Sequence, residues 1–484
     1  MADNKTKEHD RWRQSRIHKT PEPYRTEFQR DRDRIMYSLA FRRLAGITQV
    51  TAAGEAHLLH NRMSHSLKVS QIGRRLAEKL KADEKSKDLY RKAFINEDVV
   101  EAAGLAHDLG HPPFGHIGED ALNRMLGGGG SGFEGNAQSF RIVTKLAHHR
   151  TPAEKGPLGL DLTNATLNAI LKYPRQLGPK HSDGDRTDIH WGGYKDKGFY
   201  ASEQSVFKRV HSDGDFDEAW RSPEAVLMDL ADDLAYVLHD VEDFYRAGLI
   251  PLHELYNHPV TDESFKFYAK NKVLPKFGYD RKDERYDERK SKQFERDFFN
   301  PAYELFEKSL SLFKQPYLGR RIDDDHLQQF YTAILSQATD AIQLKEFDTG
   351  PLRIVTVNPI TQRLDPTVRL MIAIIRELTW FYVIDRPSLA VLQRGQDKII
   401  CTVFERLVDL LFDEKKNPVS PRGIPTQLQV ILNLQKEDRG ANEEMERKRA
   451  VSDFICILTE DQVMDLFQRF TGQTQQSVFG AWFQ

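Results

Sequence analysis

Residues 106–116 read Ala-His-Asp-Leu-Gly-His-Pro-Pro-Phe-Gly-His and place three histidines and an aspartate in one short stretch. The residues before it, 97–105, have the apolar spacing of a helix and begin with two acidic side chains, which a positive helix N-terminus favours. Gly110 and Pro112 end this helix, because proline cannot continue it and also restricts the residue before it. Four polar side chains are therefore expected at its last turn and on the loop just beyond it: His107, Asp108, His111 and His116. Imidazole and carboxylate together are ligands for a borderline or hard divalent cation.

A second helix is predicted to carry a stripe of polar side chains. Its start is marked by a serine N-cap, a proline at the first position and an acid in the first turn: Ser222, Pro223 and Glu224. Three further side chains are spaced i, i+4 and i+8 and therefore share one face: Asp232, Tyr236 and Asp240. One end of this stripe can hold a metal ion while the rest lines a pocket. Residues 60–67, His-Asn-Arg-Met-Ser-His-Ser-Leu, add two histidines upstream.

The order of these groups, a histidine, then His-Asp, then a distant aspartate, is similar to the signature of the HD phosphohydrolase superfamily. Within that superfamily the chain resembles the bacterial deoxyguanosine-triphosphate triphosphohydrolases of the dNTPase class. The motifs that carry this resemblance lie at residues 30–35, 41–44, 48–50, 107–116, 133–138 and 231–233. They run from about residue 24 to residue 246, and a weaker similarity at 451–455 and 459–461 extends toward the C-terminus. One departure is Ile47, where many members carry lysine.

The resemblance implies a divalent metal site with four ligands: His65, His107, Asp108 and Asp232. Asp233 is the competing ligand, but helical register with Tyr236 and Asp240 favours its neighbour. Mixed nitrogen and oxygen ligands with open positions suit Mn²⁺ or Mg²⁺, and Fe²⁺ would also fit, better than a structural zinc ion. The alternative is that each histidine is an ordinary core or surface residue.

The resemblance also implies a catalytic pair, His116 and Glu119. If this turn is helical, the two side chains meet on one side, and a histidine oriented by a carboxylate is a general acid/base unit. A structural hydrogen-bonded pair is the alternative. The implied substrate contacts are Gln49 and Asp240 on the sugar 3′-hydroxyl, Tyr236 against the deoxyribose, and Arg62, His111, Lys172 and Tyr173 on the phosphates.

The composition is that of a globular protein and excludes several classes. Of 484 residues, 39% are hydrophobic and 29% are charged, and the formal net charge of -2 argues against electrostatic nucleic-acid binding by the whole molecule. No apolar run approaches the roughly 20 residues of a bilayer span. Residues 1–16 lack the apolar segment of a secretory signal. Cys401 and Cys456 have no metal-site spacing and are expected to be buried thiols, which together with the missing signal favours the cytoplasm.

Arginines gather between Arg11 and Arg43 and allow two interpretations. Residues 30–34 alternate arginine with aspartate, which is typical of a solvated, salt-bridged face. The alternative is a polyphosphate pocket or an oligomer interface, to which the forked guanidinium group is suited.

Apolar residues recur with helical period along most of the chain. The helices expected from this period lie at 66–80, 97–107, 136–149, 162–172, 223–246, 299–314, 324–342, 366–384, 386–413 and 426–435. The clearest strand, 353–357, is expected in a small β-hairpin, and residues 174–222 are predicted to be a loop. The predicted fold is therefore mostly α: a polar N-terminal segment (1–23), an HD catalytic core (24–260), and a C-terminal helical region (261–484) that completes the pocket and forms an oligomer interface.

The function expected from these patterns is metal-dependent hydrolysis of dGTP, or of other dNTPs, to the deoxynucleoside and inorganic triphosphate. The resemblance also implies a homo-oligomer, for which a hexamer would fit, and allows single-stranded DNA as an effector; no membrane partner is expected. One alternative is another HD phosphohydrolase that acts on nucleoside monophosphates, cyclic nucleotides or oligonucleotide ends. Another is a nucleotide- or DNA-responsive binding protein with a vestigial site, against which the intact set of motif residues argues.

Overall fold

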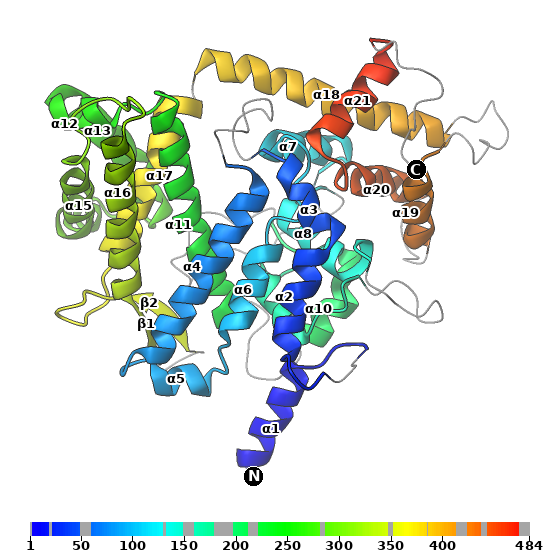
Figure 1. The fold of residues 1–484 in the computed structure, drawn as a ribbon, viewed down its shortest axis with the longest axis horizontal. Helices are drawn as coiled ribbons and strands as arrows, with labels where there is room; N and C mark the ends of the chain where they lie inside the picture. The colour runs from blue at the N-terminus through cyan, green and yellow to red at the C-terminus, as the bar shows by residue number, and fades with distance from the viewer. Residues whose placement is uncertain are drawn as a thin grey trace.

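The computed structural model describes most of the chain. The described residues are 2–18, 22–48, 60–128, 132–148, 159–178, 197–211, 221–280, 286–346, 352–384, 386–412, 424–436 and 443–473. Within them the protein is helical apart from one two-stranded hairpin, as the sequence predicts (Figure 1). No helix in this part of the chain is both long enough and apolar enough to cross a membrane.

The elements follow one another in this order. The first half of the chain forms α1 (Ala2–Arg13), α2 (Glu27–Tyr37), α3 (Leu39–Arg43), α4 (Arg62–Ala82), α5 (Lys87–Lys92), α6 (Glu97–Ala106), α7 (Gly115–Met125), α8 (Gly135–Arg141), α9 (Asn164–Ile170), α10 (Gln204–His211) and α11 (Pro223–Arg246). The second half forms α12 (Leu252–Asn257), α13 (Pro259–Lys276), α14 (Glu288–Phe294), α15 (Asn300–Leu310), α16 (Arg321–Ala341), β1 (Ile342–Lys345), β2 (Arg353–Thr356), α17 (Thr367–Thr379), α18 (Pro387–Phe412), α19 (Thr426–Lys436), α20 (Glu443–Ile455) and α21 (Glu460–Thr471). The two strands pair antiparallel, with Ile342 opposite Thr356.

Helices α4, α6 and α11 form the centre of the molecule (Figure 1). A Cβ atom on Gly104 of α6 would lie 2.7 Å from the Cα atom of Ser70 on α4, so glycine allows the two helices to approach this closely. Helix α6 is apolar on two sides: Val100 packs with α4 and α11, and Val99 packs with α2 and α9. This burial places the C-terminal end of α6 beside the first turn of α4, where the predicted site residues lie.

The apolar residues form three large clusters. One joins α4, α5 and α11 to the helices from α12 to α17, and a second joins α2, α3 and α6 to α8, α9 and α10. The third joins α7 to the C-terminal helices α18, α19, α20 and α21. In Figure 1, α18 runs along the top of the molecule from the α12–α17 side toward α19–α21. Helix α7 therefore packs with the C-terminal part of the chain, although its residues belong to the first third of the sequence.

Most of the predicted elements are confirmed, including the helix that starts at Ser222 and the hairpin at 353–357. The prediction of a loop at 174–222 is wrong in part, because this stretch contains α10, which buries Phe207 and Val210. Two inward apolar positions in so short a helix give too weak a period to be recognised. The polar N-terminal segment forms α1, and the Arg13 guanidinium at its end lies 2.6 Å from the Glu224 carboxylate.

Candidate metal centre and catalytic pair

The four predicted metal ligands come together from three elements. His107 caps the C-terminal end of α6, and its Nδ1 lies 2.7 Å from Gly104 O, so this nitrogen carries the proton and Nε2 faces the other way. Nε2 of His107 lies 3.4 Å from Asp108 Oδ1 and 3.5 Å from Asp232 Oδ1. His65 Nε2, on α4, lies 3.0 Å from the same oxygen of Asp232, which is on α11. The site is thus assembled where α4, α6 and α11 meet.

Helix α8 holds the turn that carries His107. The Ser139 hydroxyl donates to His107 O at 2.6 Å and accepts a hydrogen bond from Gly110 N at 2.9 Å. A Cβ atom on Gly110 would lie 2.1 Å from Ser139 N, so no other residue fits while the turn lies this close to α8. This contact, which is buried, fixes the position of the first ligand.

The Asp108 carboxylate is held by one guanidinium group and one imidazole group. Arg62 Nη1, in the first turn of α4, lies 2.7 Å from Asp108 Oδ2, and His111 Nδ1 lies 3.1 Å from Oδ1. Burial opposes the charged form of Asp108, but Arg62 and the two adjacent histidines outweigh it and hold the pKa of this carboxyl well below its usual range. Burial, aided by Arg62, lowers the pKa of His111.

Asp232 is held in the same manner at its second oxygen. Lys172 Nζ lies 2.8 Å from Asp232 Oδ2 and 2.8 Å from Asp229 Oδ1, and Arg221 Nη1 lies 2.5 Å from Asp229 Oδ2. Burial opposes ionisation of Asp232, but Lys172 and His107 outweigh it and keep its pKa well below the usual value. The carboxylate therefore keeps Oδ2 on the ammonium group and turns Oδ1 toward the histidines.

The donor atoms fit a divalent cation. One ligand atom from each of His65, His107 and Asp232 lies within 4.8 Å of the others, and Asp108 joins this group at the His107 end. Nε2 of His107 is buried, and at 3.4 and 3.5 Å from the nearest carboxylate oxygens it has no hydrogen-bond partner of normal length among the described residues. Buried polar atoms are rarely left in this state, and a metal ion would complete this one.

The predicted catalytic pair lies on a helix. His116 is the second residue of α7, and its Nδ1 lies 3.1 Å from Glu119 Oε2, while Glu119 Oε1 accepts a hydrogen bond from Gly135 N at 2.8 Å. Burial opposes the charged form of Glu119, but the bonds from His116 and Gly135 outweigh it and lower the pKa of the carboxyl. The imidazole itself is 74% exposed, so it can reach a bound molecule.

His111 connects the pair with the metal group. Its ring centroid lies 5.7 Å from that of His116, edge to face, while its Nδ1 faces Asp108. The donor atoms of His111, His116 and Glu119 also lie within 4.8 Å of one another, so nitrogen and oxygen donors gather at a second place. His116 therefore has two candidate roles, proton transfer and metal binding, and mutagenesis distinguishes them.

The polar stripe of α11 continues from Asp232 as predicted. The guanidinium carbon of Arg376, on α17, lies 5.0 Å from the Tyr236 ring centroid, and Arg376 Nη1 lies 3.4 Å from Asp233 Oδ1. Asp233 thus faces α17, away from the histidines. Asp240 is 3% exposed, and burial raises its pKa to about 7. Its Oδ2 has no hydrogen-bond partner within the described part of the chain, which leaves one buried oxygen for a hydroxyl group.

Two other predicted substrate contacts are Tyr173 and Gln49, and the structure describes only the first of them. The Tyr173 hydroxyl accepts a 3.4 Å hydrogen bond from Lys197, and the Lys197 ammonium lies 5.2 Å from the ring centroid of Tyr173. Gln49 lies outside the described residues; its neighbour Thr48 is described. The roles of both in substrate binding remain predictions.

Sequence reasoning missed three charged residues that shape this region: Asp229, Arg221 and Arg376. The first could have been found, because Asp229 lies one helical turn before Asp232 on the predicted stripe. Arg376 could not, because it is 143 residues from its partner Asp233 and no local pattern links them.

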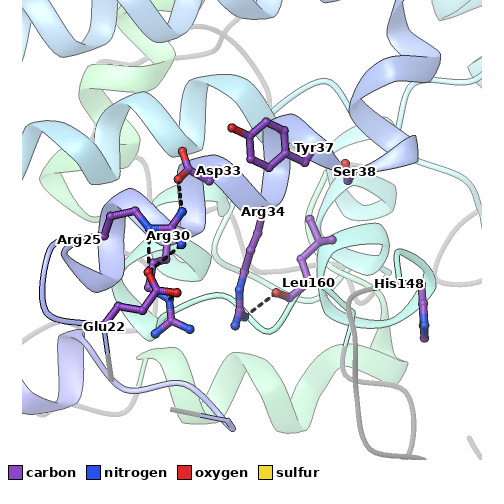
Figure 2. A pocket seen from close by; sticks show the side chains of 9 residues that line it. All are labelled: Glu22, Arg25, Arg30, Asp33, Arg34, Tyr37, Ser38, His148 and Leu160. Atoms are coloured by element: carbon purple, nitrogen blue, oxygen red, sulfur yellow. Dashed lines mark hydrogen bonds and ion pairs between the residues drawn. The ribbon is translucent and has the colours of Figure 1, made fainter. Parts of the chain in front are cut away.

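The arginine-rich region forms a separate pocket of about 310 Å³ along α2 (Figure 2). Its guanidinium groups are engaged within the protein: Arg25 Nη1 lies 2.6 Å from Asp33 Oδ2, and Arg34 Nη1 donates to Leu160 O at 2.9 Å. The predicted ion pairs are thus present, but Arg30 is buried rather than solvated. None of the residues lining this pocket belongs to the histidine–aspartate group.

Comparison with known proteins agrees with this geometry. Residues 62–237 match the model of the HD domain, and residues 363–469 match that of the phosphohydrolase-associated domain. The chain therefore contains an HD domain, and the class of protein that this defines is the HD-domain phosphohydrolases, a class of hydrolases.

Full-length relatives narrow the class further. The chain is 32% identical to a deoxyguanosinetriphosphate triphosphohydrolase-like protein of Streptomyces coelicolor, over 93% of this chain and 94% of the relative. It is 30% identical to one of Corynebacterium efficiens, over 93% of this chain and 92% of the relative. A third, from Mesorhizobium japonicum, is 40% identical over 47% of each chain. The chain belongs to the family of deoxyguanosinetriphosphate triphosphohydrolase-like proteins.

Proposed function

We propose that this protein hydrolyses dGTP, or other dNTPs, to the deoxynucleoside and inorganic triphosphate with a bound divalent cation. The observation that supports this most is the convergence of His65, His107 and Asp232, with the His116–Glu119 pair connected to them through His111. The names of the relatives supply the substrate class. In this proposal water attacks the α-phosphorus, and the bond from phosphorus to the 5′-oxygen breaks.

The chain's own residues would move the protons of this reaction. The attacking water must lose a proton and the 5′-oxygen of the departing nucleoside must gain one. His116 has Nδ1 tied to Glu119, so its Nε2 is presented for such a transfer. Since Glu119 is fixed in turn by Gly135 N, the imidazole has one preferred orientation.

Other residues would bind and orient the cation and the phosphates. A divalent cation held by His65, His107, Asp108 and Asp232 would offset negative charge that develops on the phosphate oxygens. Mn²⁺ or Mg²⁺ suits these donors best, and Fe²⁺ also fits. Arg62 and Lys172 bind one oxygen of Asp108 and of Asp232, respectively. Their positive charges therefore lie beside the metal group, where they would help to bind the negatively charged phosphates of the substrate. We further propose a homo-oligomer that controls dNTP pools, which rests on the resemblance alone, and a cytoplasmic location, which rests on the two expected thiols and on residues 1–16, which lack the apolar segment of a signal.

The products formed from dGTP show which bond the protein breaks. Incubation of the purified protein with dGTP and Mn²⁺ or Mg²⁺ is expected to give deoxyguanosine and inorganic triphosphate in equal amounts, because the break falls on the 5′-oxygen side of the α-phosphorus. Anion-exchange chromatography separates all candidate products, and a reaction with excess chelator is the control. Release of dGMP with pyrophosphate, or of dGDP with phosphate, would show that another bond breaks.

The sugar is the second test of the proposal. If Tyr236 lies under the deoxyribose and the free Oδ2 of Asp240 bonds the 3′-hydroxyl, then dideoxy-GTP leaves a buried polar group unpaired. That loss costs roughly 1–3 kcal/mol, so kcat/KM is expected to fall about 5- to 150-fold relative to dGTP. GTP is expected to be poor for the opposite reason, since its 2′-hydroxyl would press on the Tyr236 ring. Steady-state kinetics with the three nucleotides check this, and similar kcat/KM values for all three would contradict it.

A further inference from the structure

The C-terminal part of the chain carries a buried carboxylate whose partners lie in the first quarter of the sequence. Glu460 is the first residue of α21 and is 2% exposed. Its Oε1 accepts hydrogen bonds from Thr48 N at 2.9 Å, from the Thr48 hydroxyl at 2.6 Å and from Phe114 N at 3.1 Å. One oxygen therefore joins the start of α21 to two segments that are more than 300 positions away in the sequence.

Phe114 is the residue on which the start of α7 depends. It has the left-handed backbone conformation, with φ of 65°, and no side chain caps the helix there. A large residue other than glycine holds this conformation only where the surrounding structure fixes it. His116 follows two residues later, so the hydrogen bond from Phe114 N to Glu460 helps to set the direction in which α7 leaves the loop.

A second contact links the same two parts of the protein. Arg43 Nε donates to Leu458 O at 2.7 Å, just before α21, and Arg43 Nη2 donates to His111 O at 2.8 Å. The side chain is buried, and its Nη1 also donates to Leu109 O at 3.3 Å. The loop that carries His111 is thus tied on both sides to the turn between α20 and α21.

We propose that Glu460 is a positioning residue of the active site: it fixes the loop at 109–115, and through it the location of His116 relative to the metal group. This inference rests on the proposed function, because it assigns Glu460 an effect on the same reaction. The effect acts through Phe114 and Thr48, and Glu460 itself contacts neither metal nor substrate. In this proposal the phosphohydrolase-associated region, residues 363–469, helps to position the catalytic pair.

Three variants separate positioning from general stability. In Glu460→Ala, the donors at Thr48 and Phe114 lose their acceptor, so kcat is expected to fall about 10- to 100-fold, the range that a misplacement of about 1 Å produces. Metal content should stay at the wild-type level and KM within about threefold, because the ligands and the polar stripe are untouched. Glu460→Gln keeps an oxygen at the Oε1 position, so it is expected to restore kcat to within about threefold of wild type.

Gln462→Ala is the matched control. Gln462 Oε1 accepts a hydrogen bond from Thr459 N in the same first turn of α21, and within the described residues no hydrogen bond or ion pair connects it with the loop at 109–115. It should weaken this helix start while leaving kcat unchanged. If Glu460→Ala does not fold, Glu460→Asp replaces it, because the shorter carboxylate cannot reach both Thr48 and Phe114, and a fall in kcat of at least fivefold is expected.

Hydrogen–deuterium exchange supplies a readout that needs no substrate. Glu460→Ala is expected to speed exchange of the Phe114 amide and of residues 110–118, while residues 97–105 of α6 stay protected and Gln462→Ala leaves 110–118 unchanged. The inference is overturned if exchange at 110–118 does not change, or if Gln462→Ala lowers kcat as much as Glu460→Ala does. A different product from wild-type enzyme would revise the proposed function only, because the exchange comparison and the ratio of kcat values would still hold for whichever reaction is found.

Discussion

His107→Ala is expected to yield a protein that no longer holds its divalent cation and shows no measurable turnover of dGTP. The reason is geometric: Nε2 of His107 lies between Asp108 and Asp232, and its Nδ1 is already bound to Gly104. No side chain in the described surroundings can replace it, and removal of one ligand leaves two carboxylates facing each other without a cation. Loss of even an outer partner of a metal ligand costs about 10- to 100-fold in affinity, so loss of the ligand itself should exceed this.

Metal analysis of the purified variant, together with a dGTP assay, checks this expectation. Asp108→Ala should behave in the same way. His211→Ala is the matched control, because it removes an imidazole from α10, where the ring stacks on Phe207, outside the donor group. Full metal occupancy with wild-type turnover in His107→Ala would show that the metal is bound elsewhere.

His116→Ala is expected to separate chemistry from binding. The imidazole is exposed and is not among the donors assigned to the metal, so the variant should retain metal and bind dGTP with near-normal affinity. Its single-turnover rate should fall by roughly 10²- to 10⁴-fold, the usual contribution of a positioned general acid or base. Glu119→Ala should lose as much or less, and the double variant should be little worse than His116→Ala, because two residues that act as a unit are not additive.

The measurements for this test are metal content, dGTP affinity and single-turnover rate in the same preparations. His258→Ala removes an exposed imidazole at the start of α13 and serves as the control. If His116→Ala loses metal together with activity, the group of His111, His116 and Glu119 holds a cation and the proposed division of roles is wrong. If it turns over at the wild-type rate, the proton transfer belongs to another residue, and His111 is the next candidate.

The parts of the fold that could be predicted are those with a strong local signal. Helix α11 has a capped start, a proline at its first position and a long apolar period, and its predicted bounds are those observed. The end of α6 at His107 follows from the glycine and the prolines after it. By contrast, α20 is rich in charge, and α10 has only 8 residues, which is too short a window for its apolar spacing to be recognised.

The candidate site likewise contains residues that could be predicted from the sequence and contacts that could not. Candidate ligands that lie on one helix or in one motif, such as Asp232 and His107, could be proposed from spacing and resemblance, and the structure brings them together. Lys172 and Arg62 are predicted phosphate contacts, but their pairing with the aspartates could not be predicted, because Lys172 reaches Asp232 across 60 positions and Arg62 reaches Asp108 across 46. A sequence pattern records which residues are neighbours along a helix, whereas these ion pairs depend on how separate helices pack.

The packing of α7 among α18 to α21 has a consequence for how the enzyme matures. Among the described residues, the apolar side of the helix that carries His116 packs mostly with segments from the C-terminal part of the sequence, including Phe404, Phe454 and Leu466. A nascent chain that has completed the metal ligands, the last of which is Asp232, still lacks the support for this helix. Domains generally fold as units during synthesis, but here one unit is built from both ends of the polypeptide. Under the proposed function, the growing chain would complete its candidate metal ligands well before the helix that carries His116 is supported, so an unfinished chain is expected to bind metal without hydrolysing a nucleotide.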